Sequence, residues 1–479
     1  MLIDPTIATT TRPAAEPTEP TGDRIRDRPR REFDPAAGSA NRLLAPWTPS
    51  ADAPWDDAAA AHLLRRAAFG GSLREIRAAV ELGPKETVRR LVAGEPLAGD
   101  DPRLEHAADI DSIASAAARA GIDRLRTWWV HRMLLSTAPL RERMMLMWHD
   151  HLATSNAKVN DPRLMLGQLR TIDAHALGSF RAMMQAIARD PAMIVWLDGN
   201  TNVNGRANEN FARELFELFM LGVGHYSETD VREAARAFTG WHQRSGRFRF
   251  EARFHDDGRK SVLGHHGTFD GDEIIDLALE QPACGQFIGR RLCEEFITAQ
   301  PSAALVVAVA DELRDADFHL GDCMATILRS RAFMDPAIRH HRIKSPAELV
   351  IGFGRSLEMI PAGRDADRAI SAMGQHLLEP PSVAGWDGHR AWLHPAAMLQ
   401  RIRSLRLACG DSALPISRFL DAGSLRSAAD VDAAVATITL DGRIPPGVER
   451  VLTGAFSRPA ARMPQALAAC VTVPEYQLA

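Results

Sequence analysis

Helical periodicity limits the possible folds of this chain more than any other feature. From about residue 56 onward, apolar residues recur every three to four positions in one short segment after another, and Gly or Pro separates the segments. In the segment 56–69, for example, Ala59, Leu63 and Ala67 share one face before a Gly-Gly pair. This spacing is typical of amphipathic helices. The sequence therefore predicts a mainly α-helical fold with a large multi-helical domain.

Capping residues mark several helix ends. Ser72 and Glu75 have the spacing of a capping box, in which each side chain accepts a free backbone N–H of the other residue. Gly83 is expected to end that helix, and Pro84 suits the first turn of the next one. Ser227 is expected to cap a further helix.

One segment has the period of a β-strand instead. In residues 246–264, Phe248, Phe250 and Phe254 alternate with charged residues, and Asp257-Gly258 is a type I′ turn signal. We therefore expect one β-hairpin inserted among the helices, with its turn at the Asp-Gly pair.

The N-terminal segment differs in composition from the rest of the 479 residues, a length that suits two or three ordinary domains or one large domain with tails. The first fifty residues mix Pro, Thr, Asp, Glu and Arg and contain no continuous apolar run. Residues 1–50 are therefore predicted to be a disordered tail rather than a signal peptide. On this ground we expect a cytoplasmic location.

Charge and cysteine content argue against several classes of function. The net charge of −4 gives no global basic field, so we expect no nucleic-acid partner. The longest apolar runs, such as 304–310, are too short to span a bilayer. The five cysteines are odd in number and scattered, without a CxxC pair. Neither a disulfide framework nor a cysteine zinc site is expected, and a reducing compartment is the default.

The segment 208–221, NENFARELFELFML, carries several charges on a helix that has apolar residues all round. Such a helix is expected to be buried, and its polar groups must then have partners. Within the helix, Glu209 and Glu217 both stand four residues from Arg213, and Asn208 can cap the start. This interpretation requires no function.

A functional interpretation of the same helix places Asn210, Glu214 and Glu217 in an internal polar pocket. Two carboxylates three residues apart can hold a metal ion or work as acid and base. They suit a glycosidase poorly, because neighbours on one helix cannot flank the reacting centre of a sugar. Asn210 and Glu214 have no obvious partner within the helix, so their partners must come from elsewhere in the fold.

A second polar motif contains His149 and His151. On a continuous helix, residues two apart diverge by roughly 200° and cannot share a metal ion. The two histidines can converge if the helix ends there, which the polar segment after them supports. A position near a helix C-terminus also favours histidine without any function. Asp150 between them is either an orienting group or an exposed charge.

Two further segments carry polar or rigid motifs. His255 and Asp256 stand at the end of the predicted hairpin strand, and Lys260 follows the predicted turn, where solubility alone explains it. The loop 378–393 is rich in Pro, Gly and Trp, and Trp386 is expected to be a packing anchor. The GxSxG, Walker and HExxH signatures are missing from the sequence.

Together these motifs resemble a known family. The segments are MMLMWHDHLATS, NENFARELFELFMLGVG, HDDGRKSVLGHHG, RIKSPAELVIG and MGQHLLEPPSVAGW. In this order they resemble the bacterial family catalogued as domain of unknown function 1800, from about residue 58 to about residue 405. The resemblance implies a helical domain over 51–405 and leaves 406–479 as a C-terminal helical extension. It implies no established reaction.

The resemblance also bears on partners and on site residues. Members are often encoded beside a frequently exported family that resembles sulfatases and phosphatases, so export stays compatible with the sequence. Relatives more often carry Asn where this chain has Asp150 and where it has Ser382. The family's strongest motifs match Trp148, His149, His151, Asn208, Asn210, Arg213, Glu214, Glu217, Gly222, Gly240, Trp241, His255, Gly258, Lys260, Gly264, Lys344, Ser345, Pro346, Gly385 and Trp386.

The leading hypothesis is a helical, metal-dependent enzyme-like domain with one His/Glu/Asn site. Its predicted metal ligands are His149, His151, Glu214, His255 and Asp256. Its predicted catalytic residues are Glu214, Glu217, Arg213 and Lys260. A mixed His and carboxylate set suits a divalent ion such as Zn²⁺, Fe²⁺ or Mn²⁺ and a hydrolytic or oxidative reaction. One glutamate would be the general base, and Arg213 or Lys260 would bind an anionic group of the substrate.

The alternative hypothesis is a non-catalytic partner or assembly factor for the co-encoded sulfatase- or phosphatase-like protein. The charged residues would then form a buried ion-pair network, which the spacing of Arg213 and Glu217 fits equally well. The two hypotheses differ in whether His149, His151 and the two glutamates converge around a cleft.

Overall fold

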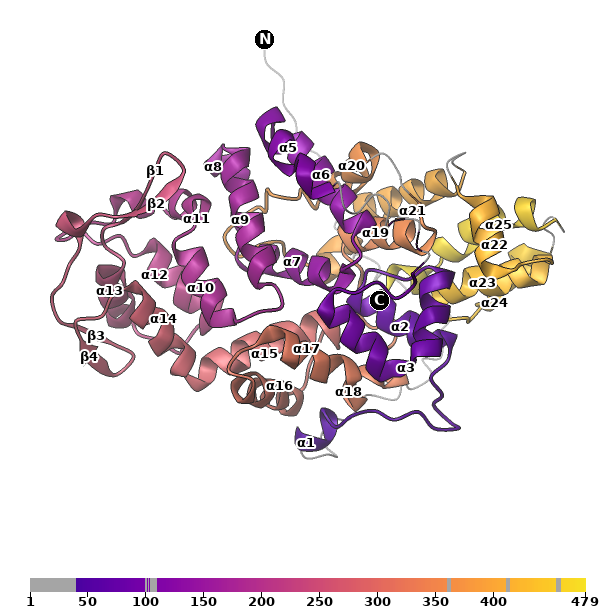
Figure 1. The fold of residues 1–479 in the computed structure, drawn as a ribbon, viewed down its shortest axis with the longest axis horizontal. Helices are drawn as coiled ribbons and strands as arrows, with labels where there is room; N and C mark the ends of the chain where they lie inside the picture. Colours follow the sequence, from indigo (N-terminus) through magenta and orange to yellow (C-terminus); the bar gives the residue numbers. More distant parts are fainter. Residues whose placement is uncertain are drawn as a thin grey trace, which may run out of the picture. The chain divides into compact units, whose positions relative to one another are not determined.

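The computed structural model describes residues 40–99, 101, 103, 110–359, 363–410, 414–453 and 458–479, which belong to one compact unit. Helices make up most of it, so the predicted mainly α-helical fold is confirmed (Figure 1). Of the predicted tail, residues 1–39 lie outside the described residues. Its last part is attached to the fold, because the N–H of Trp47 donates to the carbonyl of Arg329 at 2.8 Å.

The N-terminal half contains short and medium helices in close succession. They are α1 (Ala40–Leu43), α2 (Asp57–Ala67), α3 (Leu73–Ala93), η2 (Asp111–Ile113), α5 (Ala114–Ala120), α6 (Ile122–Leu135), α7 (Pro139–His151), α8 (Asn156–Val159), α9 (Pro162–His175), α10 (Phe180–Ala188), α11 (Pro191–Trp196), η3 (Gly199–Thr201), α12 (Asn210–Glu214), the π-helical η4 (Leu215–Met220) and α13 (Glu228–Ala237). The predicted capping box of Ser72 and Glu75 is present at the start of α3. At Gly83 the backbone leaves the helical conformation, with φ at 77°, and the helix resumes at Pro84, as predicted.

The second half is also helical. Its helices are α14 (Gly271–Glu280), α15 (Pro282–Phe296), α16 (Ala303–Asp315), α17 (Leu320–Arg329), α18 (Arg331–Met334), η6 (Pro336–Ile338), α19 (Pro346–Ser356), α20 (Gly363–Ala372), η7 (His389–Leu393), α21 (Pro395–Cys409), α22 (Ile416–Gly423), α23 (Ala428–Leu440), α24 (Pro446–Thr453), α25 (Pro459–Val471) and η8 (Pro474–Gln477). None of the helices among the described residues is long and apolar enough to cross a membrane.

Helix α7 lies in the middle of the fold, where it contacts α2, α3 and α9 (Figure 1). Most of it is buried, and its buried residues include the charged Glu142 and Arg143 as well as Trp148 and His149. Burying a charge is costly unless it is paired, so these charges predict ion-pair partners on the neighbouring helices. The candidate site is built around this helix.

The small β-structure consists of two hairpins. Strands β1 (Trp241–Arg244) and β2 (Arg247–Phe250) pair antiparallel, with Trp241 opposite Phe250. Strands β3 (Lys260–Val262) and β4 (His265–Gly267) form a second antiparallel pair. The inserted hairpin is thus confirmed, whereas its predicted position over 246–264 is wrong.

The hairpin turns lie elsewhere because two adjacent left-handed residues are needed for a two-residue turn. Ser245 and Gly246 supply them in the first hairpin, with φ of 50° and 75°, and Leu263 and Gly264 in the second, with φ of 50° and 83°. At the predicted Asp-Gly turn, the side chain of Asp256 accepts the N–H of Gly258 instead, after a short 3₁₀ turn, η5 (Ala252–Phe254).

The C-terminal helices pack against the first ones. Helices α22 and α23 both contact α3, and the buried Arg65 of α2 forms a two-pronged ion pair with Asp441 after α23. An isolated β-bridge joins Ile343 to Leu478. The described residues between 406 and 479 are therefore part of the same compact unit as the helices before them.

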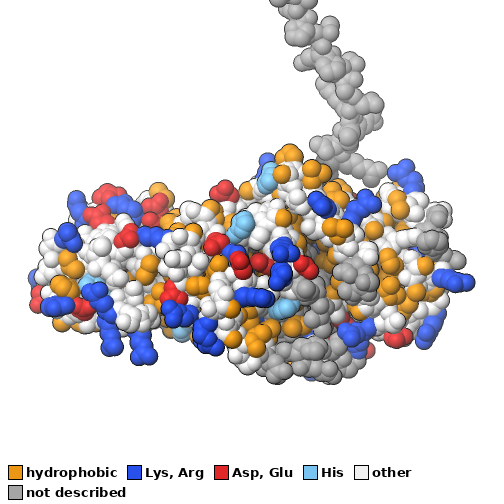
Figure 2. Space-filling view, turned by 90° about the horizontal axis from the view of Figure 1, so that it is seen from above, with side chains coloured by type: hydrophobic (Ala, Val, Ile, Leu, Met, Phe, Trp, Pro, Cys, Tyr) orange, Lys and Arg blue, Asp and Glu red, His pale blue; other side chains and the backbone are white. Residues whose placement is uncertain are grey.

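Charged side chains of both signs lie on the surface, and the cysteines lie in the interior. On the face that Figure 2 shows, acidic and basic side chains lie interspersed, as expected for a net charge of −4. All five cysteines are buried and free. Burial raises the pKa of the Cys284 thiol, so this thiol stays protonated and unreactive at neutral pH.

Candidate functional site

The segment 208–221 forms a helix whose second half is π-helical, α12 followed by η4. Asn208 accepts the N–H of Asn210 at 3.0 Å, and Arg213 pairs with Glu209 at 3.0 Å, as predicted. The predicted pair of Arg213 with Glu217 does not form. Arg213 pairs instead with Glu228 of α13 at 2.8 Å.

This helix is buried on one side only, whereas the sequence predicted that it is buried all round. Leu215, Phe216 and Phe219 are buried, whereas Glu214 and Glu217 are half-buried. Glu217 accepts the hydroxyl of Tyr226 at 3.0 Å. Burial and the neighbouring Glu217 raise the pKa of Glu214, which has no hydrogen bond or ion pair within the described part of the chain. Glu214 thus forms no ion pair or hydrogen bond with the two histidines or with an arginine among the described residues.

The two histidines of α7 are buried and occupy different surroundings. His149 Nε2 accepts the N–H of Leu378 at 3.2 Å, between the rings of Trp129 and Trp386. Burial lowers its pKa to about 4. His151 Nε2 donates to the carbonyl of Phe219 in η4 at 2.9 Å, and burial lowers its pKa to about 3. Both side chains are therefore neutral at neutral pH.

The remaining predicted site residues form a structural cluster of their own. His255 Nδ1 donates to the carbonyl of Thr239 at 2.9 Å. Asp256 pairs with Arg236 at 2.8 Å. Lys260 donates to the carbonyls of Asp256 and Gly258, at 2.7 and 3.1 Å. These three residues hold the chain after η5 together.

The predicted metal ligands therefore do not form one set. In the part of the chain that the structure describes, no group of three or more His, Cys, Asp or Glu side chains is placed to hold a metal ion. The structure brings together His255, Asp256 and Lys260, but it gives His149 and His151 other partners.

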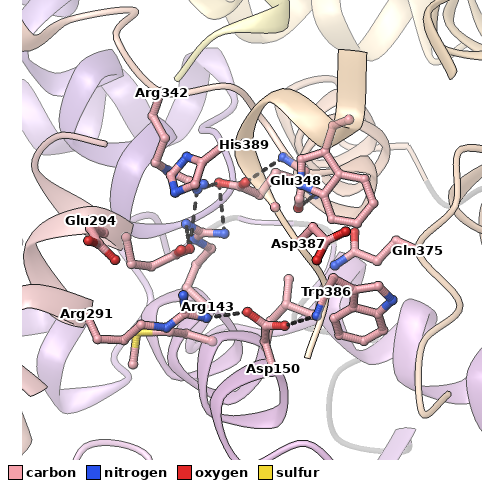
Figure 3. Close-up of a pocket in the computed structure, with 16 residues that line it drawn as sticks. Arg143, Asp150, Arg291, Glu294, Arg342, Glu348, Gln375, Trp386, Asp387 and His389 are labelled. Carbon is pink, nitrogen blue, oxygen red and sulfur yellow. Dashed lines mark hydrogen bonds and ion pairs between the residues drawn. The ribbon is translucent and has the colours of Figure 1, made fainter. Parts of the chain in front are cut away.

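A charged pocket lies beside α7, and we call it the α7–α15 pocket (Figure 3). Its cavity volume, measured as the space open to the centres of water molecules, is about 80 Å³. The charged or aromatic side chains around it are Arg143, Asp150, Arg291, Glu294, Glu295, Arg342, Glu348, Trp386, Asp387, His389 and Trp392. They come from α7, α15, the segment before α19, the start of α19, and the chain from Trp386 into η7, so segments far apart in the sequence build this one pocket.

Four of these side chains form a square of opposite charges. Arg143 pairs with Glu295 at 2.6 Å and with Glu348 at 2.9 Å. Arg342 pairs with Glu295 at 3.3 Å and also with Glu348. Burial alone would raise the pKa of Glu295, but Arg342 and Arg143 outweigh it and lower the pKa to about 2. The two positive and two negative charges of this square neutralise each other.

A fifth charge, Asp150, attaches the loop to the helices. Asp150 forms an ion pair with Arg291 of α15 and accepts the backbone N–H of Trp386 at 2.8 Å. Gly385, the residue before Trp386, has φ at 81°. It lies so close to Asp150 that a Cβ at this position would overlap Asp150. Asp150 is thus an orienting group rather than an exposed charge, and Arg291 neutralises it.

Two carboxylates of the pocket remain unneutralised. Glu294 and Asp387 form no ion pair and no hydrogen bond with any described residue. Burial raises the pKa of Glu294, although Arg291, Arg290 and His389 oppose the effect. The three arginines are matched by Asp150, Glu295 and Glu348, so the unmatched charge of the α7–α15 pocket is negative.

A second pocket adjoins the first, and we call it the His151 pocket. Its volume on the same measure is about 210 Å³. It is lined by His151, Leu218, Phe287, Arg290, Arg291, Glu294 and Ala384. Arg291 and Glu294 line both pockets, so the two share one wall on α15.

Sequence reasoning missed six charged residues of the site, namely Arg143, Arg291, Glu294, Glu295, Arg342 and Glu348. A signal was present, because Arg143 and Asp150 stand seven residues apart on one face of a helix, and the spacing of Arg291 and Glu294 is similarly helical. The sequence did single out Asp150, Trp386 and Ser345, and the pocket lies where their motifs meet.

Comparison with known proteins places the chain in a family. The family model described as "Protein of unknown function (DUF1800)" matches residues 62–478. No curated protein and no solved structure matched the chain. The match continues beyond residue 405, where the family-like helical domain was predicted to end, and includes nearly all of the C-terminal helices. The chain therefore belongs to the DUF1800 family of proteins of unknown function.

Proposed function

We propose that this domain binds a small molecule with a positively charged group in the α7–α15 pocket, and that Glu294 releases its proton to solvent as the cation binds. The observation that carries the proposal is the unmatched negative charge of Glu294 and Asp387 beside arginines that are all paired. Such an arrangement attracts a cation and repels an anion.

The size of the cavity limits the ligand. A buried water needs roughly 10–15 Å³ of such volume, so the 80 Å³ of the α7–α15 pocket correspond to a group of only a few heavy atoms. Trp386 and Trp392 also line this pocket. Aromatic rings attract ammonium and guanidinium groups. A primary amine or a guanidine fits this combination of size and charge.

The surroundings of Glu294 suit the release of a proton when a cation binds. Glu294 is half-buried, and a carboxylate whose pKa burial has raised accepts and releases protons closer to neutral pH. Its position on α15 is fixed by the neighbouring Arg291–Asp150 and Glu295–Arg143 pairs. Perturbed carboxylates in pockets are typical of catalytic sites, which supports an enzyme-like role.

The metal-dependent hydrolytic or oxidative reaction predicted from the sequence is not part of this proposal. Its ligands would be His149, His151, Glu214, His255 and Asp256, and the described residues do not group them. Metal analysis of the protein purified without a histidine tag tests that hypothesis separately.

The experiment for the proposed function is calorimetric titration of the full chain with a small amine and a small guanidine, in buffers of different ionisation enthalpy. We expect saturable binding that releases protons below neutral pH, because a cation favours the ionised form of Glu294. E294Q should abolish both the binding and the proton release. E280Q, which changes an exposed glutamate at the end of α14, is the matched control and should behave as the wild type.

Two results would contradict the proposal. One is that neither cation binds the wild type, and the other is that E294Q binds as tightly as E280Q. The family resemblance also leaves the role of partner or assembly factor for the co-encoded sulfatase- or phosphatase-like protein. Association with that protein that E294Q leaves intact, together with no cation binding, would favour this alternative.

A further inference from the structure

The wall shared by the two pockets is one face of helix α15. Phe287, Arg290, Arg291 and Glu294 follow the helical spacing of three and four residues, and all four line the His151 pocket. With a rise of 1.5 Å per residue, Arg290 and Glu294 stand about 6 Å apart along the helix axis. A molecule that lies along this face can therefore contact both side chains.

The charge of the wall changes sign along its length. Within the described residues, Arg290 is exposed and forms no ion pair or hydrogen bond, whereas the charge of Arg291 is taken up by Asp150. The unmatched charge is thus positive at Arg290, in the His151 pocket. One helical turn further on, at Glu294, it is negative.

A direct ion pair between the two residues would explain this pattern without a ligand. The structure contains no such pair, although Arg290 and Glu294 stand four residues apart. The order, with the cation on the N-terminal side, is also the weaker one for such a pair on a helix. Both side chains remain available to a third group.

The other residues that line the His151 pocket suit the middle part of a short, chain-like ligand. Leu218, Phe287 and Ala384 are apolar and match methylene groups. His151 donates its Nε2 proton to Phe219, which leaves Nδ1 as a hydrogen-bond acceptor in a neutral ring. A neutral histidine adds no charge that would compete with either end.

From these observations we propose that the ligand of this site is a small zwitterion, with its cationic group at Glu294 in the α7–α15 pocket and its anionic group at Arg290 in the His151 pocket. The inference rests on the proposed function for the cationic end and adds the anionic end. The combined site favours an amino acid whose ammonium and carboxylate groups are separated by a few methylenes.

The test compares three matched probes on the full chain by calorimetric titration: 4-aminobutyrate, butylamine and butyrate. We expect 4-aminobutyrate to bind at least ten times more tightly than butylamine, and butyrate to bind more weakly than either. R290Q should weaken 4-aminobutyrate binding to the level of butylamine and leave butylamine unchanged. E294Q should weaken the binding of both.

Two further variants control for folding and for charge. R249Q changes an exposed arginine on β2 and should bind all three probes as the wild type does. R290K keeps the positive charge and should retain most of the preference for 4-aminobutyrate, with circular dichroism confirming that each variant is folded.

The outcomes separate the two proposals. If butylamine binds in a Glu294-dependent manner but as tightly as 4-aminobutyrate, and R290Q changes nothing, the zwitterion inference is overturned and the proposed function stands. If butylamine and 4-aminobutyrate both fail to bind the wild type, both proposals are overturned.

Discussion

Asp150 on α7 and Arg291 on α15 form an ion pair, and the same carboxylate accepts the backbone N–H of Trp386 at 2.8 Å. One side chain thus joins two helices and the loop that closes the α7–α15 pocket. The side chains of Arg291 and Asp150 retain 28% and 22% of their exposure, so the pair is partly shielded from solvent and worth more than a surface ion pair.

Replacing Asp150 tests this connection. D150N should lower the free energy of unfolding by about 1–3 kcal/mol, because Arg291 loses its counterion while the amide oxygen can still accept from Trp386. D150A should cost more, since it removes that hydrogen bond as well. Urea unfolding measures both. D311N, which breaks the exposed pair of Asp311 with Arg314, should stay within about 0.5 kcal/mol of the wild type. Equal losses in D150N and D311N would contradict the role of Asp150.

The buried square predicts a loss of stability in acid. Its arginines lower the pKa of Glu295 from 4.5 to about 2. A carboxyl group whose pKa is lower in the folded protein than in the unfolded chain stabilises the fold at pH values above its unfolded-state pKa. This stability is lost as the pH falls from about 4.5 to about 2. The contribution is about 3 kcal/mol at most. We expect the slope of unfolding free energy against pH in this window to be smaller in E295Q than in the wild type. An unchanged slope would show that Glu295 is not held ionised by Arg342 and Arg143.

The two histidines of α7 predict a second loss of stability in acid, which begins at a higher pH than the one due to Glu295. Burial lowers the pKa of His149 to about 4 and that of His151 to about 3, so the unfolded chain binds their protons at a higher pH than the folded one. Stability contributed by neutral histidine is therefore full above about 6.5 and falls as the pH drops toward 4. NMR of histidine-labelled protein should show no titration of these two rings between pH 8 and pH 5. A midpoint near 6.5 for either ring would contradict their burial.

These residues also show what the sequence could and could not predict. The helical fold, the capping boxes and the Glu209–Arg213 pair follow from local spacing, which the sequence contains. The partner of Arg213 does not, because Glu228 reaches it from α13 and competes with Glu217. The π-helical stretch Leu215–Met220 has no signature in a 3.6-residue period. Likewise, the square of Arg143, Glu295, Arg342 and Glu348 joins three helices and the segment before α19, so only tertiary structure reveals it.

The metal hypothesis is tested by chelation. Because no group of suitable ligands occurs among the described residues, we expect overnight dialysis against EDTA to leave the melting temperature unchanged. The control is a zinc-dependent enzyme treated in parallel, which must lose stability or activity. A fall in the melting temperature of this protein that added Zn²⁺ or Mn²⁺ reverses would restore the predicted set of His149, His151 and Glu214 as candidates for further mutation.

Two glycines with nearly the same backbone provide a matched test of the contact between Gly385 and Asp150. Gly385 has φ at 81° and Gly264 has φ at 83°. A Cβ at Gly264 would meet nothing within 4 Å, whereas one at Gly385 would lie 3.1 Å from the Asp150 Cγ and closer still to its Oδ1 and backbone oxygen. G264A should therefore cost only the left-handed conformation, about 1–2 kcal/mol. G385A should cost about 2–5 kcal/mol, because the loop must also move away from α7. Since that movement displaces Trp386 and Asp387, G385A should weaken amine binding as well, and G264A should not. Equal losses of stability in the two variants, with amine binding intact in both, would show that the loop does not depend on its contact with Asp150.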